Sequence, residues 1–136
     1  MKKMVVTILS AFAMLATGMA IGYLFDFLIP SLKTEYANTA LYRSMDDPMM
    51  YLFFFQPFVV CGTLVWGWAR IRDRFTGSTG SKALQVALIM FFLSVIPGML
   101  MTFSSFKVSV VATVTWTVMG FFQVLTASLV FIKMSK

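Results

Sequence analysis

The sequence predicts an all-α integral membrane protein, with four transmembrane helices in a bundle and a short interfacial helix in the outer connection between helices 1 and 2. Hydrophobic residues make up 60% of the chain and charged residues only 12%, against roughly 25% charged in an ordinary soluble domain. Four apolar stretches lie at about residues 4–29, 48–69, 83–105 and 108–132. Each is long enough to cross a bilayer, which takes roughly 20 helical residues. We therefore expect residues 1–136 to form a single transmembrane domain.

The positions of the basic residues predict the orientation of these spans. Eight Lys or Arg residues fall at the two chain ends and in the 70–82 loop, and three fall on the other side, at Lys33, Arg43 and Lys107. Basic residues concentrate in the cytoplasmic parts of membrane proteins. We expect both termini and the 70–82 loop to be cytoplasmic, the 30–47 loop to face outward, and the protein to lie in a plasma membrane of the bacterial inner-membrane type.

The first span carries a Gly-x-x-x-Gly pair, Gly18 and Gly22, which lets a helix approach its neighbours closely. This pair predicts a central position for the first helix. An alternative is that residues 1–20 are a cleaved signal peptide, because two lysines precede the apolar run and small residues follow it. Cleavage would leave three spans in the same orientation.

The outer connection, residues 30–47, contains a segment that is typical of a short helix lying along the membrane surface. Tyr36 and Tyr42 have amphipathic rings suited to the headgroup layer. Asp47 followed by Pro48 is a good helix start, because a carboxylate can cap the helix and proline needs no hydrogen-bonded amide there. The cytoplasmic loop is rich in Gly and Ser and is interpreted as a linker, since the Gly-Lys-Ser/Thr ending of a phosphate-binding loop is absent.

Stripes of small or polar residues predict which face of each later span packs against protein, because such residues dominate helix contacts in membranes. Pro57 and Pro97 are expected to kink their helices. The second-span stripe is Gln56, Val60, Thr63 and Gly67, the third is Ala83, Ala87, Met90, Ser94, Gly98, Met101 and Ser105, and the fourth is Ser109, Thr113, Trp116, Gly120, Gln123 and Ala127. Gln123 is expected to form an interhelical hydrogen bond. Any stripe could instead pack against another chain.

The composition excludes several kinds of chemistry. There is no histidine, which removes histidine-ligated haem, copper, iron or zinc and any triad built on histidine. Cys61 is the only cysteine, so no intramolecular disulfide or Cys-x-x-Cys pair can form. We expect no cofactor, no metal and no catalytic residue. The net charge of +6 is interpreted as a topology signal rather than as nucleic-acid binding.

Polar residues converge on the outer layer and predict an outward-opening pocket. Asp26 follows Gly22 by one turn, and an acid at this depth is costly unless it is hydrated or paired. We expect it to pair with Arg43 or Lys33 and to accept a hydrogen bond from Gln56. The alternative is that Asp26 only anchors the first helix at the headgroups. The candidate ligand-binding residues are Asp26, Gln56, Tyr23, Glu35, Tyr36, Asn38 and Arg43.

Three functions fit this pattern. The first is a non-catalytic membrane protein, either an accessory subunit of a larger membrane complex or homo-oligomer, or a binder of an apolar or lipidic ligand in the outer pocket. The second is a small transporter or channel that uses Asp26 as a cation or proton site. The third is an intramembrane enzyme that uses Asp26 or Glu35 as acid or base, with Arg43 as an electrostatic clamp.

Overall fold

The computed structural model describes residues 2–135 and is all-helical, with 82% helix and no strand in that part of the chain. In these residues four helices are long and apolar enough to cross a membrane, which agrees with the four long apolar stretches of the sequence. The elements are α1 (Lys2–Leu28), α2 (Ser31–Tyr36), α3 (Met50–Ile71), the short 3-10 helix η1 (Arg72–Arg74), α4 (Thr79–Met90), the π-helical η2 (Phe91–Val95), α5 (Ile96–Ser105) and α6 (Val110–Met134).

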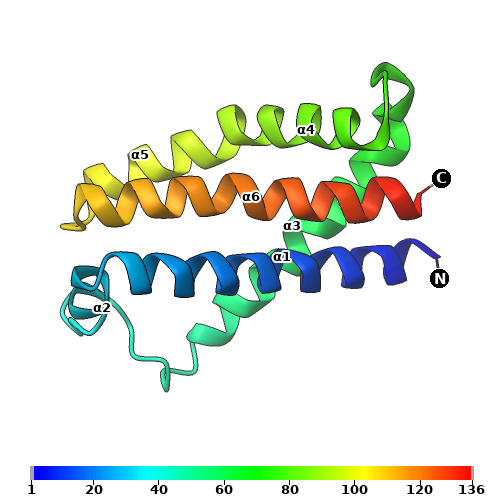
Figure 1. Ribbon diagram of the computed structural model, residues 1–136. Helices are drawn as coiled ribbons and strands as arrows, with labels where there is room; N and C mark the ends of the chain where they lie inside the picture. Colours follow the sequence, from blue (N-terminus) through cyan, green and yellow to red (C-terminus); the bar gives the residue numbers. More distant parts are fainter. Residues whose placement is uncertain (1, 136) are drawn as a thin grey trace.

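Helix α6 lies at the centre of the arrangement (Figure 1). It packs against α1 on one side and against α4, η2 and α5 on the other, and it also meets α3. Helix α1 packs against α6 and α3. The expectation that the first span is central is therefore wrong, because the fourth span is the helix that touches every other long helix.

The α1–α6 contact is close where Gly18 faces Gln123. The Gln123 side-chain amide occupies the space that a β-carbon at Gly18 would take. Its Nε2 atom donates to the backbone carbonyl of Met14 across 3.4 Å, which is the interhelical hydrogen bond expected for this residue. At Gly22, one turn further along α1, an added β-carbon would make only an ordinary van der Waals contact with the Met119 side chain.

Helix α3 packs with a different face from the one expected. Its buried residues are Pro57, Cys61, Val65 and Trp68, whereas Gln56 and Thr63 of the expected stripe are exposed. The packed face is thus rotated by one residue from the predicted one. The cause is that the apolar residues of this helix, not its small and polar ones, meet α1 and the core.

The third span changes its packed face halfway along. Ala83 and Ala87 are fully buried as expected, but the π-helix Phe91–Val95 follows them, and a π turn takes one more residue than an α turn. This accommodates Pro97, which has no N–H to donate into the helix. Beyond the π turn the contact shifts from Ser94, which is exposed, to Val95, whose Cγ1 lies 3.0 Å from the position a β-carbon would take at Gly120.

The packed core occupies the part of the bundle nearer the chain termini. Its two hydrophobic clusters include Val6, Trp68 and Phe131 in one, and Met14 and Cys61 in the other. At the opposite end α3 runs away from the other helices (Figure 1), and its first residues, Tyr51 to Gln56, are exposed. We call the end that carries the chain termini the terminal end and the opposite end the distal end.

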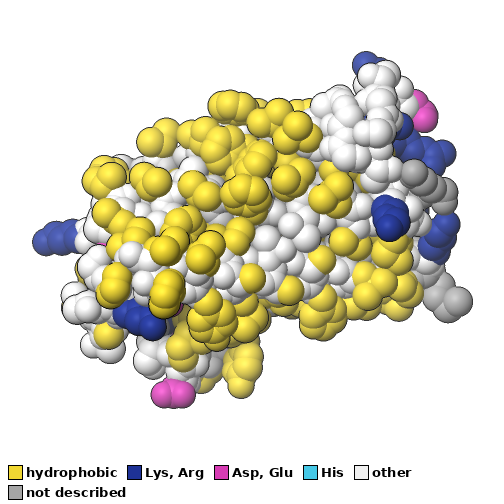
Figure 2. Space-filling model, viewed as in Figure 1, with side chains coloured by type: hydrophobic (Ala, Val, Ile, Leu, Met, Phe, Trp, Pro, Cys, Tyr) yellow, Lys and Arg dark blue, Asp and Glu magenta, His cyan; other side chains and the backbone are white. Residues whose placement is uncertain are grey.

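The surface separates charge from apolar side chains along the bundle (Figure 2). Apolar side chains cover the middle, and Lys and Arg gather at the terminal end. Four of the five acids lie between the last turns of α1 and the start of α3, namely Asp26, Glu35, Asp46 and Asp47. This distribution is what a helical bundle inside a membrane requires, with charges kept at the two ends.

Candidate functional site

The distal end is held together by contacts between the α1–α3 connection and the start of α6. Ser109 caps α6, since its Oγ accepts the N–H of Ala112 at 3.0 Å. The Glu35 carboxylate accepts the Ser109 N–H at 2.9 Å and the Ser109 hydroxyl at 2.6 Å. It also accepts the Tyr42 hydroxyl at 3.1 Å. One carboxylate therefore fastens the connection onto the N-terminus of α6, where the helix dipole favours negative charge.

Three aromatic rings complete this fastening. Trp116 Nε1 donates to the Tyr36 hydroxyl at 2.9 Å, and the two rings stack with centroids 6.0 Å apart and planes 10° apart. Tyr42 stands edge-on to both of them, at 5.6 Å from Tyr36 and 6.0 Å from Trp116. We call Glu35, Tyr36, Tyr42, Ser109 and Trp116 the distal cluster. Its rings and hydrogen bonds give the connection a defined shape.

The distal cluster has one charge state over the neutral range of pH. Burial raises the pKa of Glu35, but the hydrogen bonds from Ser109 and Tyr42 outweigh it and leave the pKa below its ordinary value. Burial, together with the Glu35 carboxylate, raises the pKa of Tyr42 to about 12. Burial also raises the pKa of Tyr36. At neutral pH the cluster consists of a carboxylate held by uncharged donors.

A cavity of about 480 Å³ lies beside the distal cluster, between the connection and the start of α3. We call it the distal cavity. Tyr36 and Tyr42 form part of one wall, and Met50 and Phe53 of α3 form part of the other. Arg43 also lines it, and its guanidinium makes an ion pair of 2.8 Å with Asp47. The Arg43 side chain is still 62% exposed, so it can reach a further anion.

The structure brings only some of the candidate ligand-binding residues together. Tyr36 and Arg43 line the distal cavity, and Glu35 lies behind it in the distal cluster. Asn38 is exposed, and its Oδ1 accepts the Ala40 N–H at 3.0 Å in a local turn. Tyr23 is 69% exposed on α1.

The expected contacts of Asp26 do not form. Arg43 pairs with Asp47 instead, and within residues 2–135 no ion pair joins Asp26 to Lys33. Gln56 is exposed and makes no hydrogen bond to Asp26, because the first turns of α3 diverge from α1. The expected polar pocket around Asp26 thus does not form, and Asp26 is not among the residues that line the distal cavity.

Residues that the sequence does not single out as ligand-binding carry much of this site. Ser109 and Trp116 were expected to pack helices, yet they anchor the connection. The sequence predicts no role for Met50 or Phe53, which line the distal cavity. The one available signal was Ser109 itself, because a serine directly before a long apolar run is a typical helix cap.

The described part of the chain contains no group of three or more acidic or cysteine side chains that could hold a metal ion. Among the helix-packing candidates, Gly120 and Gln123 lie in helix contacts, whereas Gly98 faces open space.

Comparison with protein-family models, with curated proteins and with solved structures finds no match to this chain.

Proposed function

We propose that the chain is a non-catalytic multi-pass membrane protein that binds an apolar or lipidic ligand in the distal cavity. Four apolar helices support the membrane location, and the 8 to 3 distribution of Lys and Arg supports cytoplasmic termini in an inner membrane of bacterial type. In that orientation the distal cavity opens at the depth of the outer headgroups.

The observation that carries this proposal is the distal cavity itself. Its volume of about 480 Å³ falls within the range of small-molecule sites. Aromatic and methionine side chains dominate its walls, and methionine adapts readily to the shape of an apolar ligand. Tyr36 and Tyr42 are held in place by the distal cluster, so one wall of the cavity is formed before a ligand enters.

Arg43 gives the cavity a polar end. Its guanidinium can donate to a carboxylate or phosphate while its side chain borders the apolar walls. Asp47 already neutralises part of its charge. A single-chain lipid fits this arrangement, with the alkyl chain along Met50 and Phe53 and the acidic head near Arg43.

Photo-crosslinking with a diazirine-bearing palmitic acid tests the proposal in the purified full chain. Crosslinks are expected to concentrate on residues 36–53. Ala37 lines the cavity and Ala40, in the same segment, does not. Ala37→Phe should lower this labelling about tenfold, or about 1.4 kcal/mol, because the ring would occupy volume that the ligand needs. Ala40→Phe should leave the labelling unchanged. Labelling spread evenly over all exposed helix faces would contradict the proposal.

Gln56 favours a second function, that of an accessory subunit. This side chain is exposed, forms no hydrogen bond within the described chain, and lies in a helix apolar enough to span a membrane. A primary amide in hydrocarbon is stabilised by a partner across a helix contact. A photo-crosslinking residue at Gln56 should therefore give a discrete adduct with another subunit in cell membranes. The same residue at Leu93, which is 75% exposed on the third span, should give none. Identical crosslinking patterns at the two sites would count against the subunit role.

A further inference from the structure

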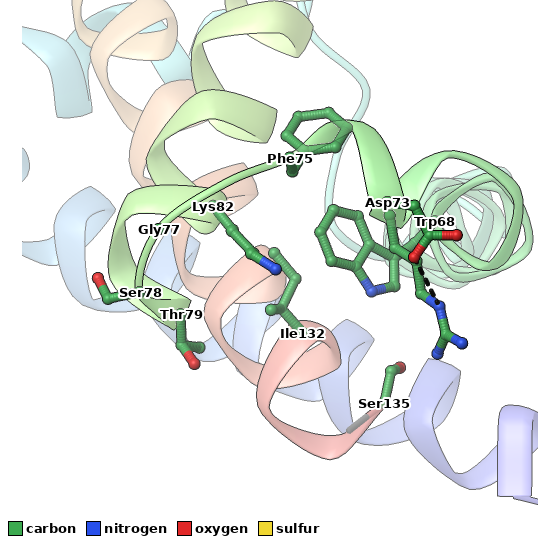
Figure 3. A pocket seen from close by; sticks show the side chains of 10 residues that line it. Trp68, Asp73, Phe75, Gly77, Ser78, Thr79, Lys82, Ile132 and Ser135 are labelled. Atoms are coloured by element: carbon green, nitrogen blue, oxygen red, sulfur yellow. Dashed lines mark ion pairs between the residues drawn. The ribbon is translucent and has the colours of Figure 1, made fainter.

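A second cavity, of about 510 Å³, lies at the terminal end and is separate from the distal site. Its walls come from the end of α3, the loop that follows, the start of α4 and the end of α6 (Figure 3). We call it the terminal cavity. Its lining includes Trp68, Arg72, Ser78, Thr79, Lys82 and Ser135.

Lys82 supplies a positive charge inside the cavity. Its side chain extends from α4 into the space between the loop and Ile132 (Figure 3), and it is partly buried. No carboxylate pairs with it in residues 2–135, where the ion pairs are Arg43–Asp47 and Arg72–Asp73. A partly desolvated ammonium group without an anion is a binding element for one.

Arg72 adds a second cation that is only loosely neutralised. The shortest contact between Arg72 Nε and Asp73 Oδ1 is 3.8 Å, and the Asp73 side chain is 94% exposed. Such a solvated pair is weak. The cavity therefore presents two cations and a single carboxylate that faces solvent, at the end of the molecule where Lys and Arg gather (Figure 2).

Hydroxyl donors border the same space. Thr79 lines the cavity from the start of α4 and Ser135 lines it from the end of α6. Ser78 Oγ accepts the Ser81 N–H at 3.2 Å, so its own hydrogen is available to a ligand. Several donors spread around two cations suit a group with several charged oxygens better than a single planar carboxylate.

The cavity is held in shape without a ligand. Trp68 is 6% exposed and packs against Phe75 and Phe131, with ring centroids 5.2 and 5.9 Å away. The loop turns at Gly77, whose φ of +97° disfavours other residues. Gln85 Nε2 then donates to the Thr76 carbonyl at 3.1 Å and fastens the loop to α4.

We propose that the terminal cavity binds a phosphate group, carried either by the headgroup of an anionic phospholipid or by a soluble phosphate ester. Lys82 and Arg72 provide the charge, and the surrounding hydroxyls donate hydrogen bonds to the remaining oxygens. The cavity lies at the membrane surface at which the basic residues gather, so a lipid phosphate can reach it from the side and a soluble ester from the water phase.

Native mass spectrometry of the full chain in neutral detergent tests this, with dioleoyl-phosphatidylglycerol and with glycerol 3-phosphate as separate probes. Lys82→Gln should weaken binding about tenfold, as loss of one charged hydrogen bond does, and Lys82→Arg should retain most of it. Lys133→Gln is the matched control, because Lys133 carries the same charge at the same end but does not line the cavity.

The two probes distinguish the sources of phosphate. Lys82-dependent binding of phosphatidylglycerol that survives excess glycerol 3-phosphate identifies a lipid site, and Lys82-dependent binding of glycerol 3-phosphate that displaces the lipid identifies a soluble ligand. Equal effects of Lys82→Gln and Lys133→Gln on both probes would overturn the proposal. If Lys82→Gln fails to fold, Arg72→Gln and Thr79→Val provide the same comparison. Ala37→Phe at the distal end should leave this binding unchanged, so the two sites are tested independently.

Discussion

Glu35→Ala removes the acceptor of three hydrogen bonds. Two of them, from Ser109, fasten the α1–α3 connection to α6, and the third, from Tyr42, lies within the connection. Each is taken at about 0.5–1 kcal/mol, the lower part of the usual range, because the carboxylate is partly solvated. The sum of about 2 kcal/mol corresponds to a roughly 30-fold larger population of the detached connection. The core formed by α1, α3 and α6 does not involve Glu35, so the effect should be a local opening and not global unfolding.

Hydrogen–deuterium exchange measures this opening directly. The backbone N–H groups of Ala37, Asn38, Leu41 and Tyr42 are hydrogen-bonded within the connection, and their protection should fall about 30-fold in Glu35→Ala. Asp46→Ala is the matched control, because it removes an exposed carboxylate of the same connection. Unchanged protection in Glu35→Ala, or an equal loss in the Asp46 variant, would refute the role given to Glu35.

Three further predictions concern packing, pH and topology. Gly18→Ala should destabilise the fold by about 1–3 kcal/mol through overpacking, whereas Gly98→Ala, whose added methyl group meets open space, should be near neutral. The temperature at which the buried Cys61 becomes reactive toward a maleimide measures the stability of both variants. The contribution of Glu35 should be complete above its ordinary pKa of 4.5 and disappear as pH falls through its lower folded value, which acrylamide quenching of tryptophan fluorescence can follow. In intact cells an impermeant thiol reagent should label Ala40→Cys but not Ser78→Cys.

Each of these has a result that would contradict it. Equal melting of the two glycine variants would mean that the α1–α6 contact is not as close as described. A rise in quenching between about pH 8 and pH 6 would show that another group controls the connection, since Glu35 does not titrate there. Labelling of Ser78→Cys in intact cells would reverse the proposed orientation.

The helices were predictable because their length and apolar composition are local properties of the chain. The long apolar helices Lys2–Leu28 and Val110–Met134 begin and end within a few residues of the expected spans. Asp47 also behaves as a helix-start residue, since its Oδ1 accepts the Met49 N–H at 2.8 Å, although α3 begins at Met50 and not at Pro48.

The packed faces were harder to predict because a helical stripe depends on phase. One residue in excess rotates everything after it, and the π turn before Pro97 adds that residue within the third span. In α3 the expectation that small and polar residues mark the packed face is wrong. Gln56 and Thr63 are exposed, and apolar residues beside them are buried.

The distal site could not be predicted from local sequence because its contacts join residues far apart in the chain. Tyr36 meets Trp116 and Glu35 meets Ser109 only after four helices have been placed. The sequence does indicate polar and aromatic side chains at this end. It does not indicate that Arg43 would select Asp47 over Asp26, because that choice depends on the path of the connection.

The Glu35–Ser109 contact also has a consequence for biosynthesis. The two residues are 74 positions apart, and a ribosome adds roughly 5–20 residues per second. The connection after the first helix is therefore synthesised on the order of 4–15 s before Ser109, the residue that anchors it. During that interval its tyrosines and its carboxylate are free to meet the translocation machinery or a chaperone, and a nascent chain arrested before the last helix would keep them in that open state.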